Sequence, residues 1–174
     1  MIAPDTDAKP GFWAFSLTLY DRPGVAEACL ALQDGFGADV NLLLLGFWRA
    51  RQGYAGWVPG EIARVQAAAA PVNAALAPLR VARRALKALQ AAEPAAEALY
   101  AEAKALELKL EQVAQAWLAG AARISPAARR KPPVPREAEM LAAAEHLAAY
   151  LDHLAPGNAD ILPAGARLLD AAFA

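Results

Sequence analysis

Apolar residues recur at helical spacing along most of this chain. Before the glycine-rich stretch at residues 35–37, an apolar row spaced i, i+4, i+7, i+11 predicts an amphipathic helix. Its members are Val25, Cys29, Leu32 and Phe36. The next segment, residues 40–52, contains four consecutive leucines and is apolar on every side, so we expect it in the middle of a bundle. Residues 13–20 alternate as a strand does, but because no other segment alternates, we predict a helix there too.

Two longer segments carry the 3–4 spacing of a coiled-coil seam. The first, residues 60–91, has the seam Ile62, Val65, Ala69, Val72, Leu76 and Leu79. The second, residues 94–122, has the seam Leu99, Ala103, Leu106, Leu110, Val113 and Trp117. Pro71 and Pro78 lie within the first segment, where the unbroken register favours one bent helix over separate helices. The two segments together predict a long helical hairpin.

The remaining pattern completes an all-α fold. Residues 124–135 form a proline-rich basic linker, and an apolar row beyond it predicts another helix. That row is Met140, Ala144, Leu147, Leu151 and Leu154. With a short helix over about residues 163–172, we expect a single-domain bundle of about five to seven helices over residues 1–174. Its parts are N-terminal helices at 11–58, the hairpin at 59–123, the linker at 124–135 and C-terminal helices at 136–174.

Composition narrows the class of protein. Lys+Arg and Asp+Glu nearly cancel, at 17 and 18, so the overall charge gives no indication of nucleic-acid or membrane binding. A single cysteine excludes a disulfide framework and a multi-thiolate metal site, and Cys29 is expected to be a buried thiol. The most apolar run, residues 40–48, is about half of the ~20 residues that a membrane-spanning helix needs. We therefore expect a cytoplasmic protein.

A polar group stands out among large apolar residues between positions 13 and 48. Asp39 is placed to cap the helix that follows it, and Asn41 and Gln33 need hydrogen-bonding partners if they are buried. Two interpretations are open. These residues fix helix packing, or they orient a small polar ligand against apolar walls formed by aromatic side chains. The candidate walls are Trp13, Tyr20 and Trp48, which can equally be core residues.

A basic row occupies the second half of the first hairpin segment. It consists of Arg80, Arg83, Arg84 and Lys87, and the opposite segment is rich in glutamate. The simplest interpretation is charge complementarity within the hairpin. The functional interpretation is a site for an acidic partner or phosphate. The row has no aromatic residues for base stacking, which argues against single-stranded nucleic acid.

The chain offers little for catalysis or metal binding. His146 and His153 are seven residues apart, about 10 Å along a helix, which is too far for one metal ion without ligands from elsewhere. We expect them on an exposed, pH-responsive face instead. Neither serine sits in a nucleophile turn, and there is no glycine loop that cradles phosphate. We predict no catalytic residues, no metal and no cofactor.

The N-terminal segment resembles a bacterial family known as domain of unknown function 2390 (DUF2390), also catalogued as TIGR02444. The residues that carry the resemblance are Trp13, Phe15, Ser16, Tyr20, Gly24, Val25, Cys29, Leu30, Leu32, Gln33, Asp34, Gly37, Asp39, Val40, Asn41 and the leucines after it. Pro78, Leu79, Arg80, Arg83, Arg84 and Lys87 are similar to the family's proline-leucine-arginine segment, and Ala105–Glu111 to its next helix. The resemblance implies a helical, cytoplasmic protein and no particular reaction.

Two functions follow as hypotheses. The first is a non-enzymatic adaptor or regulator that binds a protein partner or forms a homodimer, through the basic row or the seam at residues 62–79. The alternative is a small-molecule-binding or catalytic protein with its pocket between the first three helices. The sequence favours the adaptor, and it argues against nucleic acid and against attachment to a membrane surface.

Overall fold

The structure is a computed structural model that describes residues 11–54, 56–122 and 135–174. Seven α-helices and one short 3-10 turn, with no β-strand, account for the regular structure of these residues, which confirms the all-α prediction. The helices are α1 (Phe12–Tyr20), α2 (Val25–Phe36), α3 (Val40–Arg51), α4 (Glu61–Leu89), α5 (Ala95–Ala122), α6 (Arg136–Leu154) and α7 (Leu162–Phe173). The linker predicted at 124–135 lies outside the described residues except for Pro135.

Helix α3 is central, as its apolar composition predicts. Ten of its residues are buried, and it packs against α1, α2, α5 and α6. It begins after Asp39, whose side chain accepts a hydrogen bond from the backbone N–H of Asn41 at 2.9 Å, so the predicted cap is confirmed. Gly46 brings α6 close, because a Cβ added there would lie 3.2 Å from the Cβ of His146.

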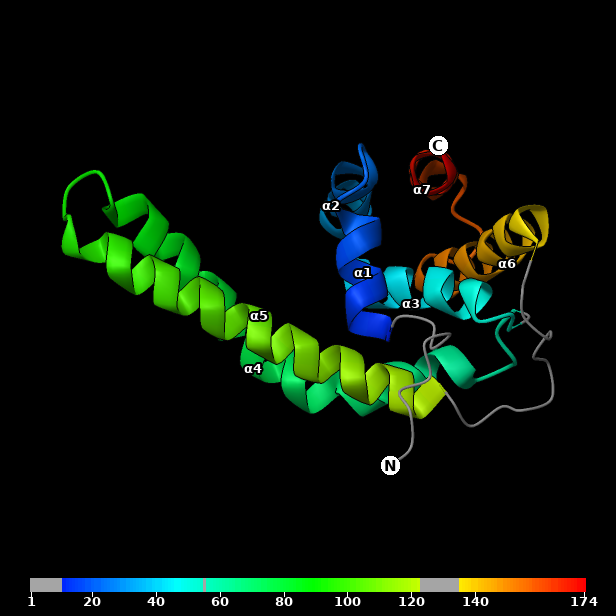
Figure 1. Cartoon of the computed structure of the whole chain (residues 1–174), viewed down its shortest axis with the longest axis horizontal. Coiled ribbons are helices and arrows are strands. Elements are labelled where there is room, and N and C mark those ends of the chain that lie inside the picture. The colour runs from blue at the N-terminus through cyan, green and yellow to red at the C-terminus, as the bar shows by residue number, and fades with distance from the viewer. Residues whose placement is uncertain (1–10, 55, 123–134) are drawn as a thin grey trace, which may run out of the picture.

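Helices α4 and α5 form the predicted hairpin, a long arm whose far end projects away from the other helices (Figure 1). The base of the arm belongs to the main core through residues such as Val65, Ala69 and Leu118. A smaller cluster of Val72, Leu76 and Ala114 continues along the arm. Pro71 and Pro78 lie within the uninterrupted α4, as the sequence register predicts.

The predicted seam of α5 is wrong as a description of its buried face. Leu99, Leu106, Val113 and Trp117 are about half exposed, whereas Glu107, Ala114 and Leu118 are buried. The charges of the hairpin explain the rotation. Arg80 and Arg83 on α4 pair with carboxylates of α5, which turns the glutamates inward and leaves the leucines outside.

A closed polar cluster joins α3 to the base of the arm. Arg49 and Glu61, each 2% exposed, form a two-pronged ion pair at 2.9 and 3.3 Å. The guanidinium carbon of Arg49 lies 4.3 Å from the centre of the Trp57 ring. Burial is the largest cause lowering the pKa of Arg49, and the charge of Glu61 opposes that shift.

The histidines correct a second prediction, since only one of them is exposed. His146 is 1% exposed, and burial, reinforced by the charge of Arg49, lowers its pKa to about 3. Its ring meets Trp57 edge-on, with the centres 5.2 Å apart. His153 lies on the surface, with Nε2 2.9 Å from Oε1 of Gln66. The core excludes water around His146, which the single-helix pattern did not indicate.

The expected buried thiol is confirmed. Cys29 is fully buried, and burial raises its pKa to about 12. Over the described ranges, no helix is both long and apolar enough to cross a membrane, and no group of three or more histidine, cysteine or acidic side chains could hold a metal ion.

Candidate ligand pocket

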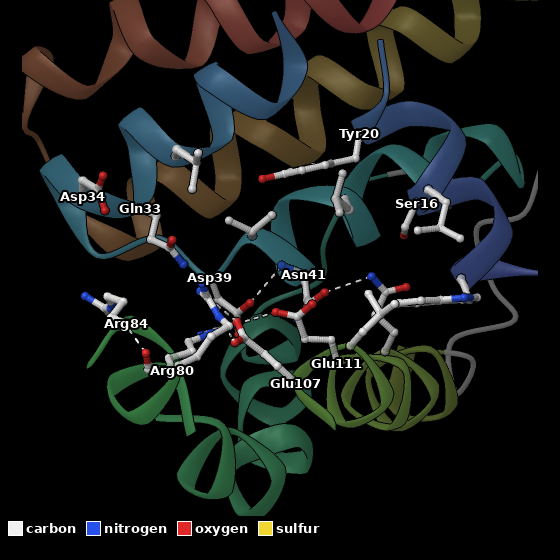
Figure 2. Close-up of a pocket in the computed structure, with 18 residues that line it drawn as sticks. Ser16, Tyr20, Gln33, Asp34, Asp39, Asn41, Arg80, Arg84, Glu107 and Glu111 are labelled. Atoms are coloured by element: carbon white, nitrogen blue, oxygen red, sulfur yellow. Dashed lines mark hydrogen bonds and ion pairs between the residues drawn. The ribbon is translucent and has the colours of Figure 1, made fainter. Parts of the chain in front are cut away.

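A pocket of about 410 Å³ lies where α1, α2 and α3 meet the arm (Figure 2). Five helices contribute to its wall, and polar groups from the arm face the polar group predicted in the N-terminal segment. The residues that line it are Trp13, Ser16, Leu17, Tyr20, Leu30, Gln33, Asp34, Asp39, Val40, Asn41, Leu44, Arg80, Arg83, Arg84, Glu107, Leu108, Glu111 and Gln115. The volume is in the range of small-molecule sites.

The pocket brings together most of the residues that sequence reasoning proposed for two separate sites. Of the six candidate ligand-binding residues, all but Trp48 line it. Trp48 is buried in the core instead, with its ring centre 5.5 Å from that of Phe12. Three members of the basic row also line the pocket, while Lys87 does not. The two predicted sites therefore share one cavity.

Asp39 is the structural hub of this wall. Besides capping α3, its carboxylate accepts a hydrogen bond from Nδ2 of Asn73 on α4 at 3.1 Å. Its backbone N–H donates to the hydroxyl of Tyr150 on α6 at 2.8 Å. Both carboxylate oxygens are thus occupied, and Asp39 holds the wall in place.

Asn41 finds its partner on the arm. Nε2 of Gln115 donates a hydrogen bond to Oδ1 of Asn41 at 2.8 Å. The other end of the Gln115 amide, Oε1, is buried and has no hydrogen-bonding partner among the residues that the structure describes, and the same is true of Oγ of Ser16. Both residues line the pocket and are 3% exposed. The wall therefore contains two buried polar groups with hydrogen-bonding capacity left over.

Charges of the arm form a paired ladder along the opposite wall. Arg80 donates to Glu111 at 2.8 Å and lies 3.5 Å from Glu107. Arg83 pairs with Glu107 as well, and this hydrogen bond is the main reason that the pKa of Arg83 is raised. The charge complementarity predicted for the hairpin is therefore present, and it occupies these two arginines within the chain.

Arg84 differs from its two neighbours in the row. Its Nε donates to the backbone carbonyl of Arg80 at 3.4 Å, and no carboxylate of the described residues forms an ion pair with it. Arg84 and Asp34 are both exposed and lie at the end of the pocket far from Ser16 (Figure 2). One end of the pocket is therefore charged and open, while the other is buried.

Tyr20 supplies a hydrogen-bond donor between these two ends. It lies above Asn41 in Figure 2, and partial burial is the largest cause that raises the pKa of its hydroxyl. The charge of Glu111 raises it further. The hydroxyl therefore stays protonated at neutral pH and can donate a hydrogen bond.

Sequence reasoning missed several residues of this site, including four polar ones. Ser16, Glu107, Glu111 and Gln115 were not proposed as binding residues. A signal was present for three of them, because Glu107, Glu111 and Gln115 are spaced i, i+4, i+8 and form one polar row on an otherwise alanine- and leucine-rich helix. Their meaning depended on which face of α5 turns inward.

Fold and pocket define an all-helical protein with a polar pocket held between an N-terminal helical layer and a hairpin arm. The family model described as "Protein of unknown function (DUF2390)" matches residues 11–118, more than half of the chain. The chain belongs to this family, as the N-terminal residues predicted. Every residue that lines the pocket falls within the matched range, whereas α6 and α7 follow it. No curated protein and no solved structure matches the chain.

Proposed function

We propose that this protein binds a small molecule in the pocket between α1, α2, α3 and the arm. One observation carries the proposal: Ser16 and Gln115 present buried polar atoms without partners in the wall of a cavity of about 410 Å³. A buried polar atom left without a hydrogen bond costs about 1–3 kcal/mol, so its placement beside a cavity favours a partner that arrives from solution. The expected cytoplasmic location is part of this proposal.

The arrangement favours this pocket over the adaptor hypothesis. The adaptor depended on a free basic row, yet Arg80 and Arg83 are engaged by Glu107 and Glu111. The seam at residues 62–79, which offered a second route to a partner, is largely buried within the chain. Binding of a small molecule uses the groups that these internal pairs leave over.

The chemistry of the wall indicates the kind of ligand. Arg84 suits a carboxylate or phosphate at the open end, because a guanidinium binds such groups with two parallel hydrogen bonds. Ser16 and Gln115 suit a hydroxyl, amide or amine at the inner end, and the Tyr20 hydroxyl can donate to the ligand between the two ends. Trp13, Leu17 and Leu44 are apolar side chains of the wall that would contact the body of the ligand. The proposal is for a small anionic ligand with a polar group at the opposite end.

The test is a thermal-shift and native mass spectrometry screen of the purified full chain. The panel contains amino acids, hydroxy acids and phosphate monoesters, with and without an aromatic or branched body. We expect at least one class to raise the melting temperature in proportion to the logarithm of its concentration and to give a one-to-one complex.

Matched variants locate the binding site. Arg84→Ala removes the unpaired guanidinium of the pocket, and Lys87→Ala removes an equal charge from the same helix outside the pocket. The ligand-induced shift should be lost in the first variant and kept in the second. Equal shifts in both variants, or no hit across the panel, would contradict the proposal.

A further inference from the structure

A second surface of the molecule, unrelated to the pocket, is an exposed apolar row along α5. Leu99, Leu106, Val113 and Trp117 are 52, 50, 41 and 46% exposed. Ala103 and Leu110 are half-buried and complete the 4–3 spacing of the row. A continuous heptad pattern on the outside of a helix is typical of a surface that packs against another helix.

No described helix of this chain fills that role. Helix α4 packs against the face of α5 that carries Glu107, Ala114 and Leu118, and the pocket takes the next face. The row lies on the remaining side of α5, along the projecting arm of Figure 1. An exposed apolar row on an extended arm is accessible to a partner along its length.

The charges beside the row indicate which helix can cover it. Glu102 and Lys109 flank the row on the side away from α4, both are exposed, and neither forms an ion pair with another described residue. In a parallel pair of α5 helices, Glu102 would approach Glu107 of the second copy, which is buried and already paired with Arg83, so Glu102 would gain no partner. In an antiparallel pair that sets Leu99 against Leu110, Glu102 faces Lys109 of the second copy.

The same register satisfies both charges at once. Twofold symmetry repeats the Glu102–Lys109 contact, so that Lys109 of the first copy also faces Glu102 of the second. The two copies therefore meet through the same surface patch. It also sets the small Ala103 against the large Leu106, which lets the two helices approach closely. The centre of the pairing falls near the middle of the arm, and the other helices of each copy then lie beyond the tip of the partner's arm.

We propose that this protein forms a homodimer through antiparallel packing of the two α5 helices along this row. The partner is a second copy, because the exposed charges of the row complement themselves under twofold symmetry. The inference rests on the surface of α5 alone and does not depend on the ligand proposed for the pocket.

The experiment is sedimentation equilibrium of the full chain over a range of concentrations, with circular dichroism to check folding. The wild-type protein should be a dimer, and Leu106→Glu should be a folded monomer. Leu141→Glu is the matched control, because Leu141 is 57% exposed, close to the 50% of Leu106, but lies on α6, outside both the row and the pocket. It should remain a dimer. A monomeric wild type, or equal effects of the two variants, would overturn the proposal.

Charge swaps test the register. Glu102→Lys or Lys109→Glu alone reverses two symmetric pairs, and we expect the dissociation constant to rise by roughly 3- to 30-fold. The combined variant Glu102→Lys/Lys109→Glu restores both pairs with their signs exchanged and should recover wild-type affinity. Failure of the combined variant to recover would overturn the antiparallel arrangement.

Discussion

Two clusters of buried polar groups in this molecule are alike in burial and different in surroundings. At the base of the arm, Glu61 pairs with Arg49, both Arg49 and His146 lie against the Trp57 ring, and none of the three residues lines the pocket. Around the pocket, Ser16 and Gln115 are equally buried, but a cavity adjoins them. Each cluster contains two buried polar atoms without hydrogen-bonding partners in the described part of the chain.

The comparison shows that an unpartnered atom alone does not indicate a ligand. Nε of Arg49 and Nδ1 of His146 lack partners among the described residues, yet neither residue lines the pocket, and attraction between the Arg49 cation and the Trp57 ring offsets part of the cost. At the pocket, the buried polar atoms without partners adjoin a cavity. Removing groups from the closed cluster should therefore damage stability, and removing groups from the open one should damage binding.

The largest expected effect is in the closed cluster. Glu61→Ala leaves the Arg49 guanidinium buried without its carboxylate, and we expect a loss of about 3–5 kcal/mol in the free energy of unfolding. Urea denaturation measures it. Glu139→Ala breaks the pair with the exposed Arg51 and should cost less than about 1 kcal/mol. Similar losses in the two variants would show that the Arg49–Glu61 pair is not effectively buried.

The pH dependence of stability is the next effect in size. The pKa of His146 is about 3 in the folded protein and about 6.5 in the unfolded chain, so the unfolded state binds the extra proton between these values. The free energy of unfolding therefore carries no penalty from His146 above pH 6.5. As the pH falls from 6.5 toward 3, it decreases by up to about 1.4 kcal/mol per pH unit.

Denaturation series at several pH values, compared between variants, isolate this contribution. His146→Leu should flatten the dependence below pH 6.5, and His153→Ala, which alters the exposed histidine, should leave it as it is. A wild-type slope that persists in His146→Leu would assign the effect to other groups.

Asn41→Ala should have an intermediate effect on stability. It removes the one hydrogen bond of the buried Gln115 amide, with an expected cost of about 1–3 kcal/mol in thermal or urea unfolding. Replacing both amides, as in Asn41→Ala/Gln115→Leu, should cost less than the sum of the single changes, because no polar group is then left unpaired. Strict additivity would mean that the two side chains do not interact.

The smallest effect on stability is expected for Ser16→Ala. Its hydroxyl has no partner to lose among the described residues, so the free energy of unfolding should stay within about 0.5 kcal/mol of wild type or rise. A ligand identified by the thermal-shift screen should bind more weakly to this variant than to the wild-type protein. A clear destabilisation with unchanged binding would show that Ser16 stabilises the fold and does not contact the ligand.

Local patterns predicted the helices well, because each depends on spacing within one segment. The row from Val25 to Leu32 and the cap at Asp39 needed no knowledge of the rest of the chain. The orientation of α5 was not predictable in this way. Its leucine row has the spacing of a core seam, but pairing between Arg83 and Glu107 on facing helices turned that row to the surface.

For the same reason, the sequence predicted the polar group and the basic row as two separate sites. Asn41 in an all-leucine helix indicated that a partner was needed, and the sequence could not identify Gln115, which is 74 positions away. Arg84 and Lys87 looked equivalent in the basic row, and only packing of the arm put one in the pocket and left the other outside. Contacts between distant segments decided both outcomes.

The sealed position of Cys29 gives the molecule an internal reporter of motion. The single thiol of the chain lies on the inner face of α2, whose outer residues Gln33 and Asp34 belong to the pocket wall. An alkylating reagent can reach it only when α2 lifts away from its neighbours, so the rate of modification measures how often that happens. A molecule held in the pocket would tie α2 to the arm and slow this reaction, which makes an unmodified native cysteine a direct gauge of occupancy.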